Sequence, residues 1–124
     1  MKANELMIGD WVRLKKDYVV DKDENIKLTS LDIHRIDEGD YVVEPIPLTD
    51  EILRKNGFWT EPNVGYIIDD YSGTQIIYDS WNHNLRIIEN YKVRLDIETF
   101  NDLSVHELQH ALRICEIIER EIEL

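Results

Sequence analysis

Four short segments between residues 65 and 97 constrain the fold more than any other feature of this chain. They are rich in isoleucine, valine and tyrosine, turn-forming residues separate them, and they comprise Gly65–Asp70, Thr74–Asp79, 85–89 and 92–97. Such residues suit a pleated, half-buried surface, and connections this short join antiparallel neighbours. The sequence therefore predicts an antiparallel β-meander in the second half of the chain.

The apolar period changes after the meander. Five residues recur at the three- and four-residue spacing of one helix face: Val105, Leu108, Ala111, Leu112 and Cys115. This stripe predicts a C-terminal amphipathic helix packed on the sheet, with the single cysteine as a small buried hydrophobe. Residues 119–124 either continue this helix or form a short strand, and the sequence leaves both open.

The first 46 residues contain short apolar segments that predict a small antiparallel β-sheet or an SH3-like barrel. The expected strands are 10–16, 18–20, 26–28 and 31–36. Pro45 and Pro47 then hold the backbone extended, because proline fixes φ. A short linking helix over 50–56 is expected next, with Thr49 as its N-cap and Gly57 at its end.

These elements predict one compact α+β domain spanning residues 1–124, with an N-terminal lobe (1–46) and a second lobe (47–124). The 14 Lys and Arg against 26 Asp and Glu give a net charge of −12. That charge repels phosphate backbones and anionic lipids, so nucleic acid and membranes are disfavoured and a basic protein surface is the favoured partner. Without a long apolar run or a signal-peptide core, we expect a cytoplasmic protein. The oligomeric state stays open.

Residues 106–110 read HELQH, a pattern in which two histidines one helical turn apart bind zinc beside a glutamate base. A zinc-dependent hydrolase would use the following residues: His106 and His110 as ligands, Glu107 as base, and Glu116 or Glu119 as third ligand. The extended form of the motif has a glycine and a third histidine at positions 113 and 116, where this chain has arginine and glutamate.

A structural role competes for the proposed base. Ser104 and Glu107 fit a capping box, which would hold the carboxylate at the helix start and away from a metal-bound water. Projection at about 100° per residue also turns His106 and His110 away from the apolar stripe, toward solvent. We therefore expect no catalytic residue and no cofactor, with zinc as the alternative.

Two weaker patterns each have a structural alternative. Residues 21–25 with Asp32 resemble a calcium-binding loop, but Ile26 replaces the glycine that such a loop needs, which favours a solvated acidic turn. Trp11, Tyr18 and Tyr41 are weak candidates for an aromatic binding face on a small β-sheet, with Lys15 and Lys16 beside them. Aromatic residues on short strands more often belong to the core.

Three separated blocks span the chain: KANELMIGDWV at 2–12, PIPLTDEILRKNGF at 45–58 and VHELQ at 105–109. Together they resemble a family of small, functionally uncharacterised proteins encoded by Bacteroidota bacteria, their prophages and their phages. The resemblance implies a genomic setting but no catalytic residue. It also implies a glycine at the end of the C-terminal helix, where this chain has Glu116.

The sequence therefore favours an acidic accessory protein of a phage or mobile element that acts by protein binding and not by catalysis. One alternative is the zinc-dependent hydrolase built on HELQH. The other is a protein that sequesters a small signalling molecule in a pocket between the two lobes.

Overall fold

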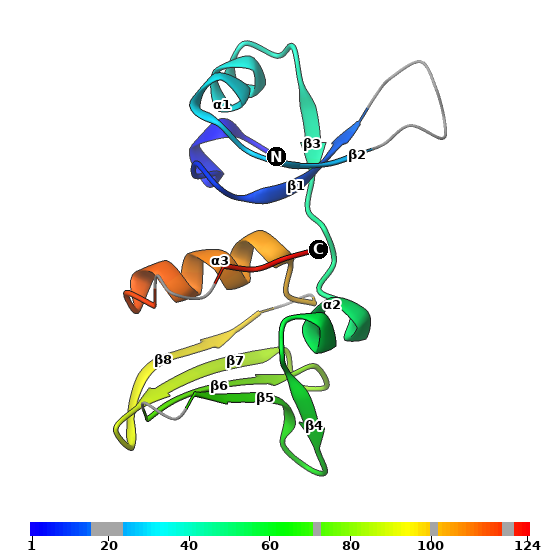
Figure 1. The fold of residues 1–124 in the computed structure, drawn as a ribbon. Coiled ribbons are helices and arrows are strands. Elements are labelled where there is room, and N and C mark those ends of the chain that lie inside the picture. Colours follow the sequence, from blue (N-terminus) through cyan, green and yellow to red (C-terminus); the bar gives the residue numbers. More distant parts are fainter. Residues whose placement is uncertain (16–23, 71–72, 100–101, 118–120) are drawn as a thin grey trace. The chain divides into compact units, whose positions relative to one another are not determined.

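The computed structural model describes residues 1–15, 24–70, 73–99, 102–117 and 121–124. Its elements follow in the order η1 (Ala3–Glu5), β1 (Trp11–Lys15), β2 (Glu24–Lys27), α1 (Ser30–Asp37), β3 (Val42–Glu44), α2 (Asp50–Lys55), β4 (Trp59–Glu61), β5 (Gly65–Asp70), β6 (Thr74–Asp79), β7 (Asn84–Glu89), β8 (Lys92–Glu98) and α3 (Val105–Ile114) (Figure 1). The strands form two antiparallel sheets, so the predicted α+β class is confirmed.

The chain divides into two compact units, and α3 contributes to both. The first unit comprises Met1–Pro47 and Ser104–Gln109, and the second comprises Leu48–Leu103 and His110–Leu124.

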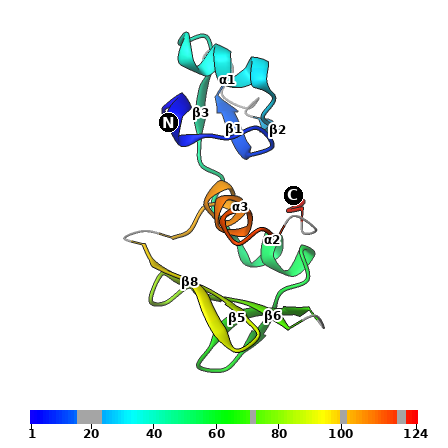
Figure 2. The same ribbon diagram turned by 90° about the vertical axis from the view of Figure 1, so that its left-hand side faces the viewer.

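The first unit contains a three-stranded antiparallel sheet in the order β2-β1-β3, with α1 on one side of it (Figure 2). Its described strands do not close into a barrel, so the small-sheet alternative is confirmed and the SH3-like barrel is wrong. Six apolar side chains form the buried core between this sheet, α1 and the N-terminal segment: Leu6, Val12, Leu14, Leu28, Ile36 and Val43.

Residues 31–36, predicted as a strand, lie inside α1. A capping box starts this helix: the Thr29 hydroxyl accepts from Asp32 N–H at 3.3 Å, and the Asp32 carboxylate accepts from Thr29 N–H at 2.9 Å. The strand prediction failed because Leu31 and Ile33 alternate like strand residues, whereas the cap and the spacing from Ile33 to Ile36 favour a helix. The strand predicted at 18–20 lies outside the described residues.

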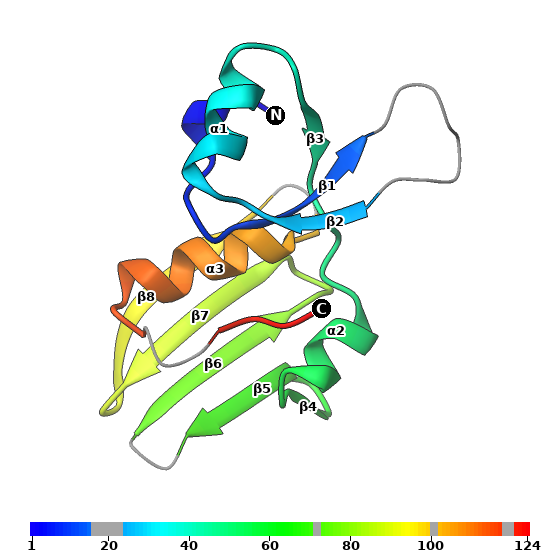
Figure 3. The same cartoon turned by 45° about the horizontal axis from the view of Figure 1, so that its top comes forward.

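The second unit contains a five-stranded antiparallel sheet in the order β4-β5-β6-β7-β8, which confirms the predicted meander (Figure 3). Ile76 in β6 pairs with Ile68 in β5 and Ile87 in β7, and all three side chains are buried. This cross-strand row forms the centre of the apolar face. The first strand, β4, was not predicted because it has only three residues and no buried side chain.

Helix α2 confirms the predicted linking helix and ends at Lys55. The Thr49 hydroxyl accepts from Ile52 N–H at 3.2 Å and caps its start. Gly57 has φ +91°, and the Phe58 N–H donates to the Leu53 carbonyl at 3.0 Å, which closes the helix as a Schellman motif does. Phe58 is buried, as its position in this motif predicts.

The predicted C-terminal helix is confirmed as α3, and its second half lies over one face of the five-stranded sheet together with the tail (Figures 1 and 3). Residues 121–124 form neither helix nor strand. The Asn56 side chain holds this tail, because its amide nitrogen donates to the Glu123 carbonyl at 2.7 Å and its oxygen accepts from Glu123 N–H at 2.8 Å. Ile122, the residue that precedes Glu123, is buried.

Helix α3 ends at a residue with a left-handed backbone. Glu116 has φ +58°, its N–H donates to the Arg113 carbonyl, and the Ile117 N–H donates to the Leu112 carbonyl at 2.8 Å. This is the same motif that ends α2, with glutamate at the position that glycine usually occupies.

We expect Glu116→Gly to raise the free energy of unfolding by about 1 kcal/mol, because glycine adopts positive φ without the steric cost of a Cβ. Urea denaturation measures the change. Glu116→Ala is the matched control, since it removes the carboxylate but keeps the Cβ, and it should leave stability within about 0.5 kcal/mol. Equal gains for both variants would assign the effect to charge.

Candidate functional site

The start of α3 forms the predicted capping box. The Ser104 N–H donates to Glu107 Oε1 at 3.1 Å, and the Glu107 N–H donates to Ser104 Oγ at 3.4 Å. The Ser104 hydroxyl also donates to Glu107 Oε1 at 2.8 Å. The Glu107 carboxylate, which the zinc hypothesis uses as a base, therefore caps the helix.

His106 is 8% exposed, so the prediction that it faces solvent is wrong, and His110 is half-buried. His106 Nδ1 lies 2.9 Å from Ser104 Oγ. Because the Ser104 hydroxyl hydrogen points to Glu107, we assign the hydrogen in this contact to His106 Nδ1. The helical projection missed this burial because it considered only the apolar stripe, and Ser104 gives the imidazole a polar partner inside the protein.

The proposed zinc ligands are not gathered around one point in the described part of the chain. Across those residues, no group of three His, Cys, Asp or Glu side chains has the arrangement needed to hold a metal ion. Glu116 is exposed and its backbone closes α3, while Glu119 lies outside the described ranges. At the start of this stretch, Ser104 and Glu107 form the capping box of α3.

Gln109, within the same motif, connects α3 to the turn before β1. Its Nε2 donates to the Gly9 carbonyl at 2.9 Å, and its Oε1 accepts from Trp11 N–H at 2.8 Å. Gln109 is buried, and so is Asp10, whose carboxylate accepts from Met7 N–H at 2.8 Å. One side-chain amide therefore joins two segments that lie 98 to 100 positions apart in the sequence.

Trp11 and Tyr41, two of the weak binding candidates, lie on different faces of the small sheet. Trp11 alternates with buried Val12 along β1, whereas Tyr41 packs against the cluster that contains Val12. Arg35 Nη1 donates to the Tyr41 hydroxyl at 2.6 Å. The third candidate, Tyr18, lies outside the described residues.

Two further sequence candidates have structural roles. The Asp32 carboxylate accepts from both the Thr29 N–H and the Thr29 hydroxyl, so it caps α1 instead of completing a calcium loop; residues 21–23 of that loop lie outside the described part. Cys115 is buried as predicted, and this burial raises the pKa of its thiol. A raised pKa lowers the thiolate fraction and with it the reactivity.

The structure reveals a groove of about 550 Å³ at one end of the five-stranded sheet. The β4–β5 connection and the β6–β7 turn meet there, because β4 and β6 flank β5. The lining residues are Thr60, Glu61, Pro62, Asn63, Val64, Gly65, Tyr66, Asp79, Ser80, Trp81 and Asn82. This volume lies within the range of small-ligand pockets in proteins.

The groove combines aromatic rings with negative charge. Trp81 is 91% exposed, which is unusual for so large an apolar side chain, and Tyr66 is a second aromatic residue that lines the groove. Glu61 and Asp79 supply two carboxylates, and the lining contains no lysine, arginine or histidine. These groups suit a cationic ligand, which aromatic faces and carboxylates both attract.

Asp79 holds the turn that carries Trp81. Its Oδ1 accepts from Trp81 N–H at 3.0 Å and Asn82 N–H at 3.3 Å, and its Oδ2 accepts from Asn82 Nδ2 at 2.7 Å. The Asn82 side-chain hydrogen bond is the main cause of the lowered pKa of Asp79. The carboxylate therefore stays ionised at neutral pH while it orders the turn.

Tyr66 and Gly65 fix the other side of the groove. The Tyr66 hydroxyl donates to Asp50 Oδ1 at 2.6 Å, and this bond is the main cause of the lowered pKa of Asp50, a residue of α2. Gly65 has φ +111°, and a Cβ there would lie 2.5 Å from the Tyr78 carbonyl oxygen. Glycine is therefore required for β5 and β6 to approach closely beside the groove.

Comparisons of the chain with protein-family models, curated proteins and solved structures found no match. Among the described residues, no helix combines the length and apolar character required to cross a membrane.

The groove itself was missed by sequence reasoning. Trp81 could have indicated it, because a tryptophan in the turn between two strands belongs to neither face of the sheet and so is not explained by sheet packing.

Proposed function

We propose that this protein acts by binding a basic surface of another protein, as an accessory factor of a phage or mobile element. The observation that supports this most directly is the groove, in which exposed Trp81 lies with Glu61 and Asp79 and without any basic side chain. Exposed aromatic residues of this kind often dominate binding energy at protein interfaces. The net charge of −12 further favours encounter with a cationic partner.

The hydrogen bonds of the groove favour binding over catalysis. Both carboxylate oxygens of Asp79 accept hydrogen bonds from its own turn, and the Tyr66 hydroxyl is bonded to Asp50. These groups hold the surface in shape, and an acid–base role would require them to exchange protons with a substrate. The supporting feature is thus a fixed anionic and aromatic surface.

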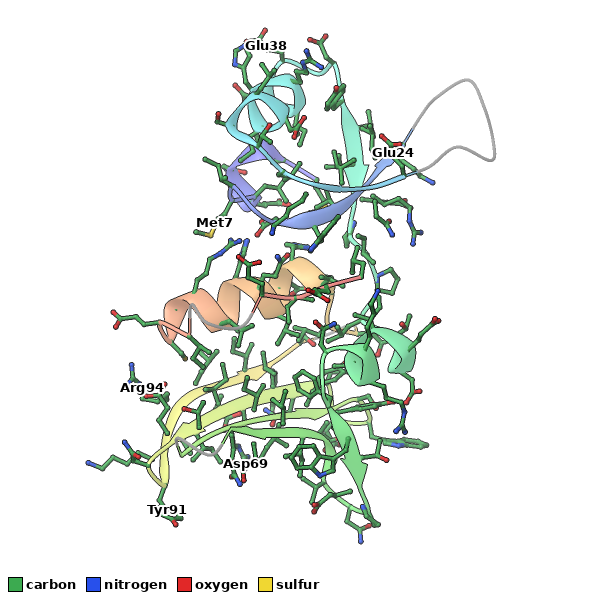
Figure 4. The ribbon with its side chains drawn as sticks, viewed as in Figure 1. Met7, Glu24, Glu38, Asp69, Tyr91 and Arg94 are labelled. Carbon is green, nitrogen blue, oxygen red and sulfur yellow. The ribbon has the colours of Figure 1, made fainter. Side chains whose placement is uncertain are left out.

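Trp81→Ala should weaken capture of the partner about tenfold or more, because truncating a central aromatic contact removes most of its binding energy. The protein is immobilised, exposed to host lysate, and the bound proteins are quantified by mass spectrometry at about 50 and about 300 mM salt. Tyr91→Ala is the matched control. Tyr91 is also fully exposed, but it lies in the β7–β8 turn at the other end of β7 (Figure 4).

The proposal requires a protein that both the natural chain and the Tyr91→Ala variant recover, that Trp81→Ala loses, and that high salt releases. If no recovered protein distinguishes Trp81→Ala from Tyr91→Ala, the groove is not the binding surface. If recovery is insensitive to salt, the partner is not held by charge.

A further inference from the structure

We infer that the groove binds an arginine side chain of the partner, with the guanidinium stacked on Trp81 and donating hydrogen bonds to Glu61. This inference rests on the proposed function and specifies its chemistry. It follows from the arrangement of the acceptors in the groove.

Glu61 is the carboxylate that the fold leaves available to a ligand. Its Oε1 accepts a hydrogen bond from Nε1 of Trp59, two positions earlier on β4, at 3.3 Å. Its Oε2 has no hydrogen-bond partner among the described residues. Asp79 differs, because both of its oxygens are occupied by the turn. The Trp59 contact orients Glu61 but leaves one oxygen to accept from an incoming donor.

Further acceptors line the groove. Asn63 and Ser80 line the groove, and neither side chain makes a hydrogen bond within the described part of the chain. A ligand with several donors would therefore find a carboxylate oxygen, an amide oxygen and a hydroxyl in one groove. The indole face of Trp81 adds a flat surface beside them.

Arginine matches this set better than lysine. Its guanidinium is planar, carries five N–H donors and stacks on aromatic rings, whereas the lysine ammonium is a compact and strongly hydrated charge. Cation–π contacts in proteins accordingly involve arginine more often. Citrulline has nearly the shape of arginine without the charge, so it separates the contribution of charge from that of shape.

Nuclear magnetic resonance titration of the full chain tests this inference with N-acetyl-arginine amide and its lysine and citrulline counterparts. The indole N–H signal of Trp81 is identified with Trp11→Phe and Trp59→Phe variants. We expect the arginine compound to shift this signal saturably, the lysine compound to bind at least about threefold more weakly, and citrulline to give no saturable shift.

Glu61→Gln should weaken arginine binding about fivefold, because it removes the negative charge of the group that accepts hydrogen bonds from the guanidinium. Glu38→Gln is the matched control, since it changes the net charge equally at an exposed residue beyond α1 (Figure 4). Equal binding of arginine and citrulline, or equal losses in the two variants, would overturn the inference.

The two proposals fail in different ways. Partner capture that depends on Trp81, combined with no arginine-dependent shift of its signal, would reject arginine and keep the binding function. An arginine-dependent shift without Trp81-dependent capture would reject the partner-binding function and keep the arginine site.

Discussion

Gln109→Ala is expected to lower the free energy of unfolding by about 3 kcal/mol. The substitution removes the amide that accepts from Trp11 N–H and donates to the Gly9 carbonyl; Gln109 is buried, and both hydrogen bonds are partly buried. A backbone group left without its partner away from water costs about 1–3 kcal/mol, and the Trp11 N–H and the Gly9 carbonyl would each lose theirs. Urea denaturation followed by tryptophan fluorescence measures it.

Gln75→Ala is the control for this prediction. Gln75 is also a glutamine with a side-chain hydrogen bond, to Asp69 at 3.3 Å, but that bond is exposed. Its removal should change the free energy of unfolding by less than about 0.5 kcal/mol. Similar losses for the two variants would show that Gln109 has no special role in joining α3 to the turn before β1.

Gly65→Ala should lower the free energy of unfolding by more than about 3 kcal/mol, through steric overlap and through backbone strain. The added Cβ would lie 2.5 Å from the Tyr78 carbonyl oxygen and 3.1 Å from Asp79 Cα, which are backbone atoms of β6 that cannot rotate away. The same movement would displace the turn that holds Trp81, so partner binding should fall as well.

Gly39→Ala separates the two causes. Gly39 also has positive φ, at +84°, but a Cβ there would meet no atom within 4 Å. The free energy of unfolding of the Gly39→Ala variant should therefore fall by only about 1 kcal/mol, the cost of placing an L-residue in the left-handed region. Thermal unfolding of both variants gives the comparison. Equal losses would show that the approach of β5 to β6 is not tightly packed.

Features set by neighbouring residues were predictable. The Thr49 cap, the Gly57 helix end and the Ser104 capping box each depend on residues within a few positions, and each is confirmed. The same local rule applies to Thr29 and Asp32, where two alternating apolar residues misled the strand prediction. Local signals were thus sufficient only where the apolar period agreed with the cap.

Features set by distant residues were not predictable from the sequence. Gln109 bonds to backbone atoms of residues 98 and 100 positions away, and no local pattern points to them. The groove depends on β4 and β6 flanking β5, and β4 was itself too short to predict. The burial of His106 likewise depends on its surroundings and not on the helical period alone.

Hydrogen bonds of the Asn56 side chain hold the C-terminal tail. The hydrogen bonds between Asn56 and Glu123 both involve main-chain atoms of Glu123, so they select no particular residue type at position 123. Almost any replacement there would be held equally well, and proline is the exception because its nitrogen has no hydrogen to donate. The fold can therefore tolerate a change in the chemical character of this residue while keeping the tail in place.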